Sequence, residues 1–200
     1  MDKARSELSL KNGDVLILID IQNDYLPGGS LAVPQSDEII PVINAYIERF
    51  VDHGLTIVAA RDWHPHDHSS FNEQGGTLPA HCIADTPGSA FPKSLQLPED
   101  ARIISKTSSA DQEGLSAFDG TRLLALLQRI EAKRLFIAGL ATDTSILHTA
   151  LEAAQHPCTV FLLLDAVRAF NRTPYDGENA IAKMKAAGVL TTRLSRLKES

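Results

Sequence analysis

Short apolar runs alternate with segments of helical periodicity along the whole chain. The apolar runs predict strands at residues 15–19, 55–60, 102–105, 135–138, 160–164 and 189–192. The periodic segments predict helices at about 36–50, 121–131, 144–154 and 178–187. Such an alternation is typical of a parallel sheet that is covered by helices on both faces. We therefore expect an α/β fold of Rossmann-like type, a three-layer α/β/α sandwich with a central, mostly parallel sheet.

Cap and turn residues mark the ends of two of these helices. Ser36, which two acidic residues follow, is expected to cap the first helix, and Gly54 is expected to stop it. Gly188 is expected to end the last helix before the final strand. The proline-rich stretch 61–100 is long for a connection inside a compact domain, and we predict that it is functional.

The composition is that of an ordinary globular protein, with 44% hydrophobic and 22% charged residues in a chain of 200. We interpret residues 1–200 as a single domain, with residues 1–12 as an N-terminal extension. The 19 basic and 25 acidic residues give a net charge of −6, and no basic cluster could neutralise a run of phosphates. Nucleic acid is therefore not expected as a partner.

The cysteine content and the apolar runs indicate a cellular location. The chain has 2 cysteines, too few for a disulfide framework, which favours a reducing cytoplasm. No apolar run approaches the roughly 18 residues that cross a bilayer, and the charged N-terminus is not followed by the apolar segment of a cleavable signal. We expect a cytoplasmic protein without a membrane partner.

Polar residues follow four of the predicted strands at the point where each strand ends. Asp20 follows the first strand, Asp62 and His64 follow the second, Lys106 follows the third, and a turn that contains Ser145 follows the fourth. In open parallel sheets, ligands bind at the carboxyl ends of the strands, so these side chains are expected to meet in one crevice. Each residue also has an ordinary alternative by itself, as a turn residue, a surface lysine or a helix cap.

Histidines gather in the long loop, where four of the 7 in the chain fall within residues 64–81. Asp62 and His64 leave a strand at alternate positions, which point to one side, and His81 follows in the same loop. One carboxylate with several imidazoles is a suitable ligand set for zinc or iron. A solvated histidine-rich loop is the alternative.

The turn at residues 139–146 leads from a strand into a helix, with Ser145 in the first helical turn. A nucleophile at this place has backbone N–H groups and the positive end of the helix nearby, which suits the stabilisation of an oxyanion. Serine is also a common cap at such turns, and the residue type alone favours the cap.

Five separated motifs extend through roughly residues 13–192. They are Asp20-Ile21-Gln22-Asn23-Asp24-Tyr25 with 27–33, Arg61-Asp62-Trp63-His64-Pro65 with 67–71, Pro79-Ala80-His81-Cys82 with 86–88, Lys106 with 116–118, and 139–146. Together and in this order they resemble the isochorismatase-like cysteine hydrolases, and within that family the nicotinamidase/pyrazinamidase branch.

The resemblance implies roles for individual residues. Asp20 would be the catalytic base, and Lys106 would be the catalytic lysine. One divalent metal ion would be the cofactor, with zinc as the first choice and iron or manganese as alternatives. The implied metal ligands are Asp62, His64 and His81, with His68 as a fourth, variable ligand.

The chain departs from the family pattern at the nucleophile. Ser145 stands where the family has its cysteine, and neither cysteine of the chain occupies that position. Among the residues that would surround the substrate, Tyr25 keeps an aromatic ring, whereas Leu78 and Leu115 stand where Trp and Tyr are common. These three residues are the predicted substrate-binding residues, and the changes leave the identity of the amide open.

The resemblance implies hydrolysis of nicotinamide, or of a related small amide, to the acid and ammonia, a step of NAD metabolism. The expected protein is a homo-oligomer. The backbone N–H groups of Ala141 and Ser145 would form the oxyanion hole. Because an alcohol forms almost no anion at neutral pH, a protein with Ser145 as its nucleophile is expected to turn over its substrate slowly, if at all.

Two origins of Ser145 stay open, namely an engineered substitution that traps substrate and a natural homologue with different chemistry. The otherwise complete set of site residues favours the first. Two other functions also stay open. A vinyl-ether hydrolase of the isochorismatase type needs no thiol, although the intact set of metal ligands argues against it. A catalytically dead homologue would bind a small amide without hydrolysing it.

Overall fold

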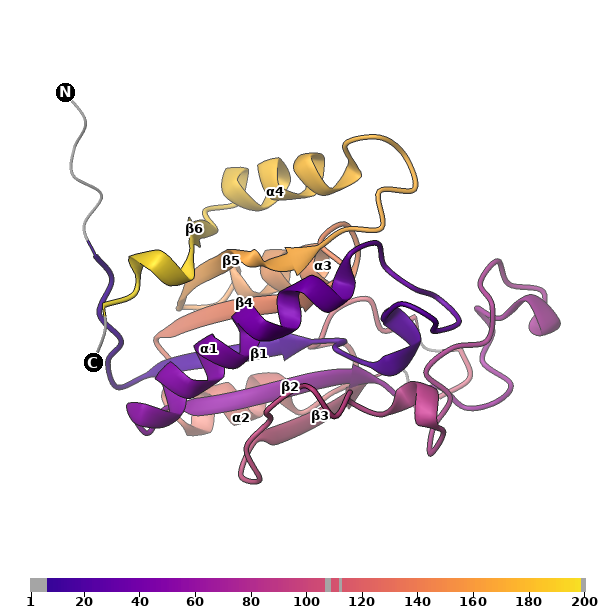
Figure 1. Cartoon of the computed structure of the whole chain (residues 1–200), viewed down its shortest axis with the longest axis horizontal. Coiled ribbons are helices and arrows are strands. Elements are labelled where there is room, and N and C mark those ends of the chain that lie inside the picture. The colour runs from indigo at the N-terminus through magenta and orange to yellow at the C-terminus, as the bar shows by residue number, and fades with distance from the viewer. Residues whose placement is uncertain (1–6, 107–108, 112, 199–200) are drawn as a thin grey trace.

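The computed structural model describes residues 7–106, 109–111 and 113–198. Within them, six strands form one sheet in the order β3-β2-β1-β4-β5-β6, with helices on both faces (Figure 1). All neighbouring strands pair in parallel. The predicted three-layer α/β/α architecture is therefore confirmed.

Each predicted strand and helix is present. The strands are β1 (Asp14–Ile19), β2 (Thr56–Asp62), β3 (Arg102–Lys106), β4 (Arg134–Leu140), β5 (Thr159–Arg168) and β6 (Leu190–Thr192). The α-helices are α1 (Ile40–Asp52), α2 (Leu123–Arg129), α3 (Ser145–Ala153) and α4 (Asp176–Ala186). Short 3-10 segments lie at Asn23–Tyr25, Ser36–Ile39, Asn72–Gln74, Pro87–Ser89 and Leu194–Arg196.

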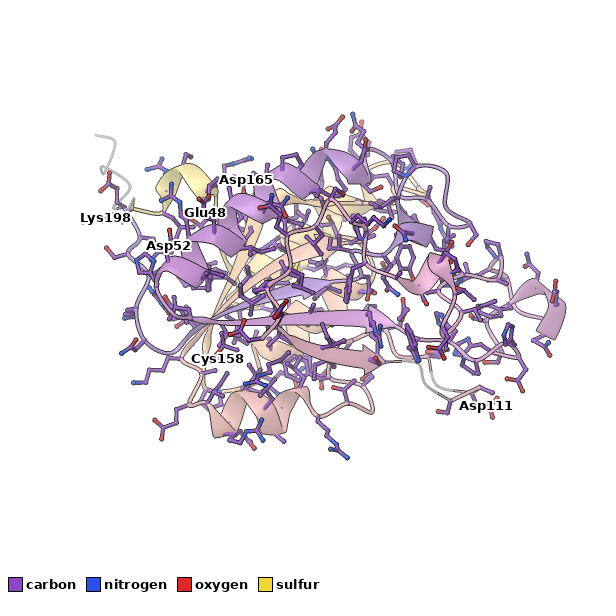
Figure 2. All side chains as sticks on the ribbon, turned by 60° about the horizontal axis from the view of Figure 1, so that its bottom comes forward. Glu48, Asp52, Asp111, Cys158, Asp165 and Lys198 are labelled. Carbon is purple, nitrogen blue, oxygen red and sulfur yellow. The ribbon has the colours of Figure 1, made fainter. Side chains whose placement is uncertain are left out.

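Two apolar clusters lie on the opposite faces of the sheet. On one face, Phe50 of α1 shares a buried cluster with Leu18 of β1. On the other face, α2, α3 and α4 contribute the buried side chains of Leu127, Ile146 and Met184. Side chains fill the space on both sides of the sheet (Figure 2). Because β1 is buried on both faces, all of its residues are shielded, which explains its continuous apolar run.

The first helix begins later than predicted. Ser36 opens a 3-10 segment, and the α-helix begins only at Ile40. The hydroxyl of Ser36 donates a hydrogen bond of 2.8 Å to the backbone carbonyl of Tyr25, so it does not cap the helix. Because Ser36 is buried, its hydroxyl needs a partner inside the protein, and the neighbouring loop supplies one. Gly54, with a φ of +63°, follows the end of the helix as predicted.

The long loop between β2 and β3 lies beyond the carboxyl ends of these strands (Figure 1). Its described residues form 3-10 segments and isolated bridges, but no α-helix. One bridge joins His64 to Ile83, which brings the start of the loop next to its middle. The loop can therefore supply side chains from several of its parts to one end of the sheet.

The two ends of the described chain meet, because Leu8 and Leu197 form a parallel bridge. Residues 1–6 of the predicted N-terminal extension lie outside the described residues. None of the helices formed by the described residues has both the length and the apolar character that a membrane span requires.

Candidate active site

Three ionisable side chains meet at the carboxyl ends of the first three strands. Asp20 follows β1, and the parallel register places Asp62 of β2 directly beside Lys106 of β3. Nζ of Lys106 lies 2.5 Å from Oδ1 of Asp62 and 3.0 Å from Oδ2 of Asp20. All three residues are buried. One buried ammonium group therefore bridges two buried carboxylates.

The pKa values of these groups differ because their surroundings differ. Burial and the charge of Asp62 raise the pKa of Asp20 to about 7, although Lys106 is close. For Asp62, Lys106 and the nearby His64 outweigh the effect of burial and hold the pKa at about 2. The pKa of Lys106 is raised, because the two carboxylates outweigh the effect of its burial. At neutral pH, Asp62 and Lys106 are therefore charged, while Asp20 can take up or release a proton.

Ser145 is the first residue of α3, and its hydroxyl lies close enough to Asp20 to oppose the rise in the pKa of that carboxyl. Apart from the ion pair with Lys106, neither carboxylate oxygen of Asp20 has a hydrogen-bond partner among the described residues, so lone pairs remain available. No backbone carbonyl among the described residues accepts the backbone N–H groups of Ala141 and Ser145.

Neither cysteine takes the place of Ser145. Cys82 is buried next to His81 in the long loop. Cys158, labelled in Figure 2, directly precedes β5. Ser145 follows β4, and because β4 and β5 are parallel, the two residues belong to opposite ends of the sheet. Ser145, unlike Cys82 and Cys158, lines a cavity together with Lys106.

Asp62, His64 and His81, the metal group from here on, bring three possible ligand atoms within 4.8 Å of one another. Nδ1 of His64 donates to the carbonyl of His81 at 3.1 Å, and Nδ1 of His81 donates to the carbonyl of Pro79 at 2.8 Å. Because each Nδ1 carries the ring proton, each Nε2 keeps a lone pair, as a metal-binding imidazole requires. Burial lowers the pKa of His64 to about 4. This donor set fits a divalent metal ion.

His68 lies beside the metal group but is bonded differently. Its ring centre is 4.4 Å from that of His64. Nδ1 of His68 lies 2.8 Å from the hydroxyl oxygen of Ser70 and 3.3 Å from its backbone nitrogen. The structure therefore brings His68 next to the other three residues, with its Nδ1 facing Ser70.

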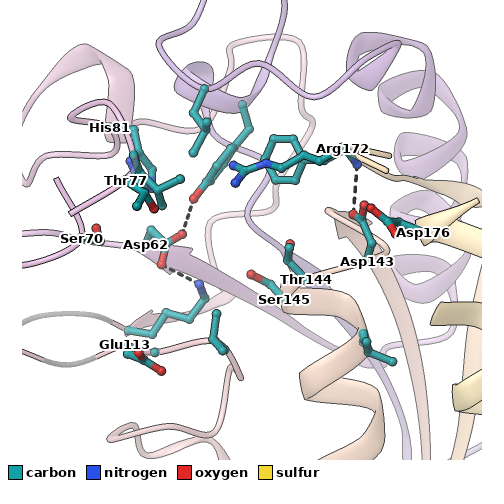
Figure 3. Close-up of a pocket in the computed structure, with 18 of the residues that line it drawn as sticks. Asp62, Ser70, Thr77, His81, Glu113, Asp143, Thr144, Ser145, Arg172 and Asp176 are labelled. Atoms are coloured by element: carbon teal, nitrogen blue, oxygen red, sulfur yellow. Dashed lines mark hydrogen bonds and ion pairs between the residues drawn. The ribbon is translucent and has the colours of Figure 1, made fainter. Parts of the chain in front are cut away.

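The metal group and Ser145 line one cavity of about 640 Å³, part of which Figure 3 shows. The predicted substrate-binding residues Tyr25, Leu78 and Leu115 line the same cavity. The hydroxyl of Tyr25 donates to Oδ2 of Asp62 at 2.5 Å, so this ring is fixed between the pocket and the metal group. The sequence-predicted residues are thus brought together around one space.

Phe170 adds an aromatic ring to this cavity that the motifs do not indicate. It follows β5, and its ring centre lies 6.4 Å from that of Tyr25. The position of Phe170 after a strand was a signal in the sequence that it could reach the site. The end of the fifth strand carries no unusual cluster of polar residues, so the sequence did not single it out.

Gln22 is a second residue without a predicted role. Its Nε2 donates to the backbone carbonyls of Asp62 at 2.7 Å and Ser89 at 2.9 Å, and its Oε1 accepts the backbone N–H of Asp62 at 2.8 Å. The side chain is fully buried. Gln22 therefore fixes the backbone that carries Asp62. Its signal in the sequence was its place in the motif Asp20-Ile21-Gln22-Asn23-Asp24-Tyr25, just after the first strand.

The fold and the site together define a class of α/β/α domain in which a buried aspartate–lysine pair, a serine at a helix start and a metal group surround one pocket. The isochorismatase domain family matches residues 14–194. The chain belongs to this family.

Proteins with assigned activities resemble the chain over nearly its whole length. The nicotinamidase of Escherichia coli (strain K12) is 31% identical, over 92% of this chain and 97% of that protein. The crystal structure of the pyrazinamidase of Pyrococcus horikoshii in complex with zinc has 45% identity and a TM-score of 0.87, and covers 91% of this chain and 99% of that one. PnC1 from L. infantum in complex with nicotinate has 32% identity and a TM-score of 0.88, over 96% and 99% of the two chains. The expected resemblance is confirmed.

Proposed function

We propose that this chain is an amidohydrolase that converts nicotinamide, or a related small amide, to the acid and ammonia. The proposal is carried by one arrangement: Ser145 and Lys106 line the same cavity, and Asp20 lies 3.0 Å from Lys106. The relatives support the choice of substrate, since they are described as a nicotinamidase, a pyrazinamidase with zinc and a protein with bound nicotinate. From the same relatives we infer a role in NAD metabolism. We also propose that the protein is cytoplasmic and forms a homo-oligomer.

In the proposed reaction, the hydroxyl oxygen of Ser145 attacks the carbonyl carbon of the amide, and its proton passes to Asp20. The C–N bond then breaks, and the nitrogen takes the proton from Asp20 and leaves as ammonia. Water attacks the remaining serine ester, again with Asp20 as the base, and the proton returns to the serine oxygen as the acid leaves. A pKa of about 7 suits Asp20 to accept and release a proton at neutral pH.

The negative charge that develops on the carbonyl oxygen has three donors nearby. The backbone N–H groups of Ala141 and Ser145 have no backbone acceptor among the described residues. The ammonium group of Lys106 lines the same pocket. Preorganised donors of this kind are a large source of catalysis, because they need no reorientation when the charge develops.

The metal group would hold a divalent ion, with zinc as our first choice and iron or manganese as alternatives. When bound, such an ion supplies a Lewis acid that orients a polar atom of the substrate, such as a ring nitrogen. Gln22 holds the backbone of Asp62, and Tyr25 holds its carboxylate, so the oxygen ligand is positioned by this chain's own residues.

The serine makes the reaction slow. A hydroxyl group gives up its proton far less readily than a thiol, whose ordinary pKa is about 8.5, and Asp20 is a weak base for it. We therefore expect little ammonia from the unchanged chain and a strong gain on substitution of Ser145 by cysteine.

Ammonia release by the zinc-loaded proteins tests the proposal, with nicotinamide, pyrazinamide and propionamide as substrates. We expect Ser145→Cys to exceed the unchanged chain by at least about 100-fold. Thr144→Cys is the matched control, because Thr144 lines the same pocket one residue earlier. Asp20→Asn in the Ser145→Cys background should abolish the gain. A folded, metal-loaded Ser145→Cys protein that releases no ammonia from any amide would instead favour a vinyl-ether hydrolase or a binding protein.

A further inference from the structure

Arg172 carries a positive charge into the outer part of the pocket. It belongs to the loop between β5 and α4 and lines the cavity. Figure 3 shows its side chain extending from this loop toward the side of the pocket where Asp62 and His81 lie. Its guanidinium carbon is 5.1 Å from the centre of the Phe170 ring, a cation–π contact that restricts its orientation. Although Arg172 is exposed, this contact places its guanidinium group at the cavity.

Two carboxylates that line the same cavity as Arg172, those of Asp143 and Asp176, accept hydrogen bonds from the loop backbone. Asp143 accepts two backbone N–H groups of the loop, at 3.0 and 2.8 Å, and Asp176 accepts a third at 2.8 Å. These bonds fix the shape of the loop. No carboxylate among the described residues forms an ion pair with Arg172. Its guanidinium group is thus available to a ligand.

Two further charged residues, Lys183 of α4 and Glu113, line the same cavity. In Figure 3, Glu113 and Arg172 lie on opposite sides of Asp62, so the acidic side chain does not neutralise the guanidinium group. Lys183 adds a second positive charge on the side of α4. The wall formed by the β5–α4 loop and α4 also carries the carboxylates of Asp143 and Asp176, so its charges balance. Because the oxygens of these two carboxylates are bonded to the loop backbone, the guanidinium group of Arg172 is the group on this wall that suits an anionic ligand.

The cavity has room for a ligand that is longer than a single small amide. At about 640 Å³ it is in the range of pockets that hold drug-sized ligands, larger than a single small amide requires. Leu78 and Leu115 provide apolar wall without ring planes that would confine a flat substrate. A substrate whose amide lies at Ser145 can therefore extend toward Arg172.

We propose that Arg172 forms a carboxylate subsite, so that the preferred substrate is a small amide with a carboxylate at the end remote from the amide. The position of the amide at Ser145 rests on the proposed function. A guanidinium group presents paired N–H donors in the planar geometry that matches a carboxylate, and such charged hydrogen bonds are stronger than neutral ones. Nicotinamide, which is neutral, enters the same pocket without this contact.

Calorimetric binding to the zinc-loaded full chain, which retains Ser145 and so consumes little ligand, tests the subsite. The probes are three acid amides, 3-carbamoylbenzoate, succinamate and glutaramate, each paired with its neutral diamide. The members of a pair have nearly the same shape and differ in charge. We expect at least one acid amide to bind about 10-fold more tightly than its diamide. Arg172→Gln should reduce this ratio to about 1, and Arg172→Lys should keep part of it.

Lys185→Gln is the control, because it removes the same charge from an exposed position of α4 that does not line the cavity. It should leave the ratio unchanged. Ratios near 1 for all three pairs in the unchanged chain, or a ratio that survives Arg172→Gln, would overturn the subsite. Hydrolysis of nicotinamide by Ser145→Cys without any acid preference would overturn the subsite alone. An acid preference that depends on Arg172, without hydrolysis by any variant, would support the subsite and contradict the proposed function.

Discussion

Nζ of Lys106 lies 3.0 Å from Oδ2 of Asp20, and both side chains are buried. An ammonium group at this distance usually holds a carboxyl in its charged form. Here the pKa of Asp20 is nevertheless raised to about 7, because burial and the charge of Asp62 outweigh Lys106. Asp62 lies closer to the ammonium group, at 2.5 Å, and keeps its own charge. One lysine between two carboxylates therefore leaves one of them able to exchange a proton.

This arrangement predicts a pH dependence of stability. The pKa of Asp20 rises from 3.8 to about 7 on folding, so its stabilising effect is fully present below about 3.8 and is lost as the pH rises through 7. Because Asn cannot ionise, the Asp20→Asn variant should not show this loss of stability with rising pH. We expect the free energy of unfolding of the unchanged chain to fall by about 2 to 3 kcal/mol relative to the variant between pH 5 and pH 8. Urea unfolding at both pH values measures it, and parallel changes in the two proteins would contradict the assignment.

The metal group predicts a selective effect of histidine substitutions on metal content. His81→Ala removes one of the three ligands, and we expect at least about a 100-fold loss of zinc affinity with the fold retained. His66→Ala is the matched control, since His66 is exposed in the same loop. Elemental analysis after zinc loading and dialysis should find one ion per chain in the control and far less in His81→Ala. Equal metal content in both would refute the metal group.

Gln22 is predicted to be important for stability through its bonds to the backbone. Gln22→Leu leaves the buried N–H and carbonyl of Asp62 and the carbonyl of Ser89 without their partner, and we expect a loss of about 2 to 4 kcal/mol. Gln155→Leu, the same substitution at an exposed position, should change stability by less than about 0.5 kcal/mol. Urea denaturation compares the two. A loss of similar size in both variants would show that the bonds of Gln22 are not its cause.

Two ion pairs of this chain should differ strongly in their effect on stability. Arg134 donates through Nε to the buried Asp14 at 2.6 Å, so Asp14→Asn leaves a shielded guanidinium group without its counter-charge and should cost about 3 kcal/mol. Glu38, whose side chain is 52% exposed, pairs with Arg168 at 3.0 Å. Glu38→Gln should cost less than about 1 kcal/mol, because water screens this pair. Thermal or urea unfolding of the two variants measures these losses of stability. A larger loss for Glu38→Gln than for Asp14→Asn would disprove the prediction.

The sequence by itself determined the fold class and the parts of the site that lie at strand ends. Strands such as β1 are buried on both faces and therefore read as continuous apolar runs, and parallel strands place the residues that follow them at one edge. This rule places Asp20, Asp62 and Lys106 together from the sequence alone. The motifs added His64 and His81 as metal ligands. Their spacing by itself was also compatible with a solvated histidine-rich loop.

Only the tertiary structure decided what depends on contacts between loops. The hydroxyl of Ser36 has a partner in the loop that contains Tyr25, so a local cap signal was misleading. Phe170 and Arg172 reach the pocket because bonds to Asp143 shape the loop after β5, and no periodic pattern encodes the direction of such a loop. The proton-exchanging state of Asp20 has the same origin. It results from burial and from charges contributed by separate strands, and these act through space, whereas hydrophobic periodicity records only which side of a single element is covered.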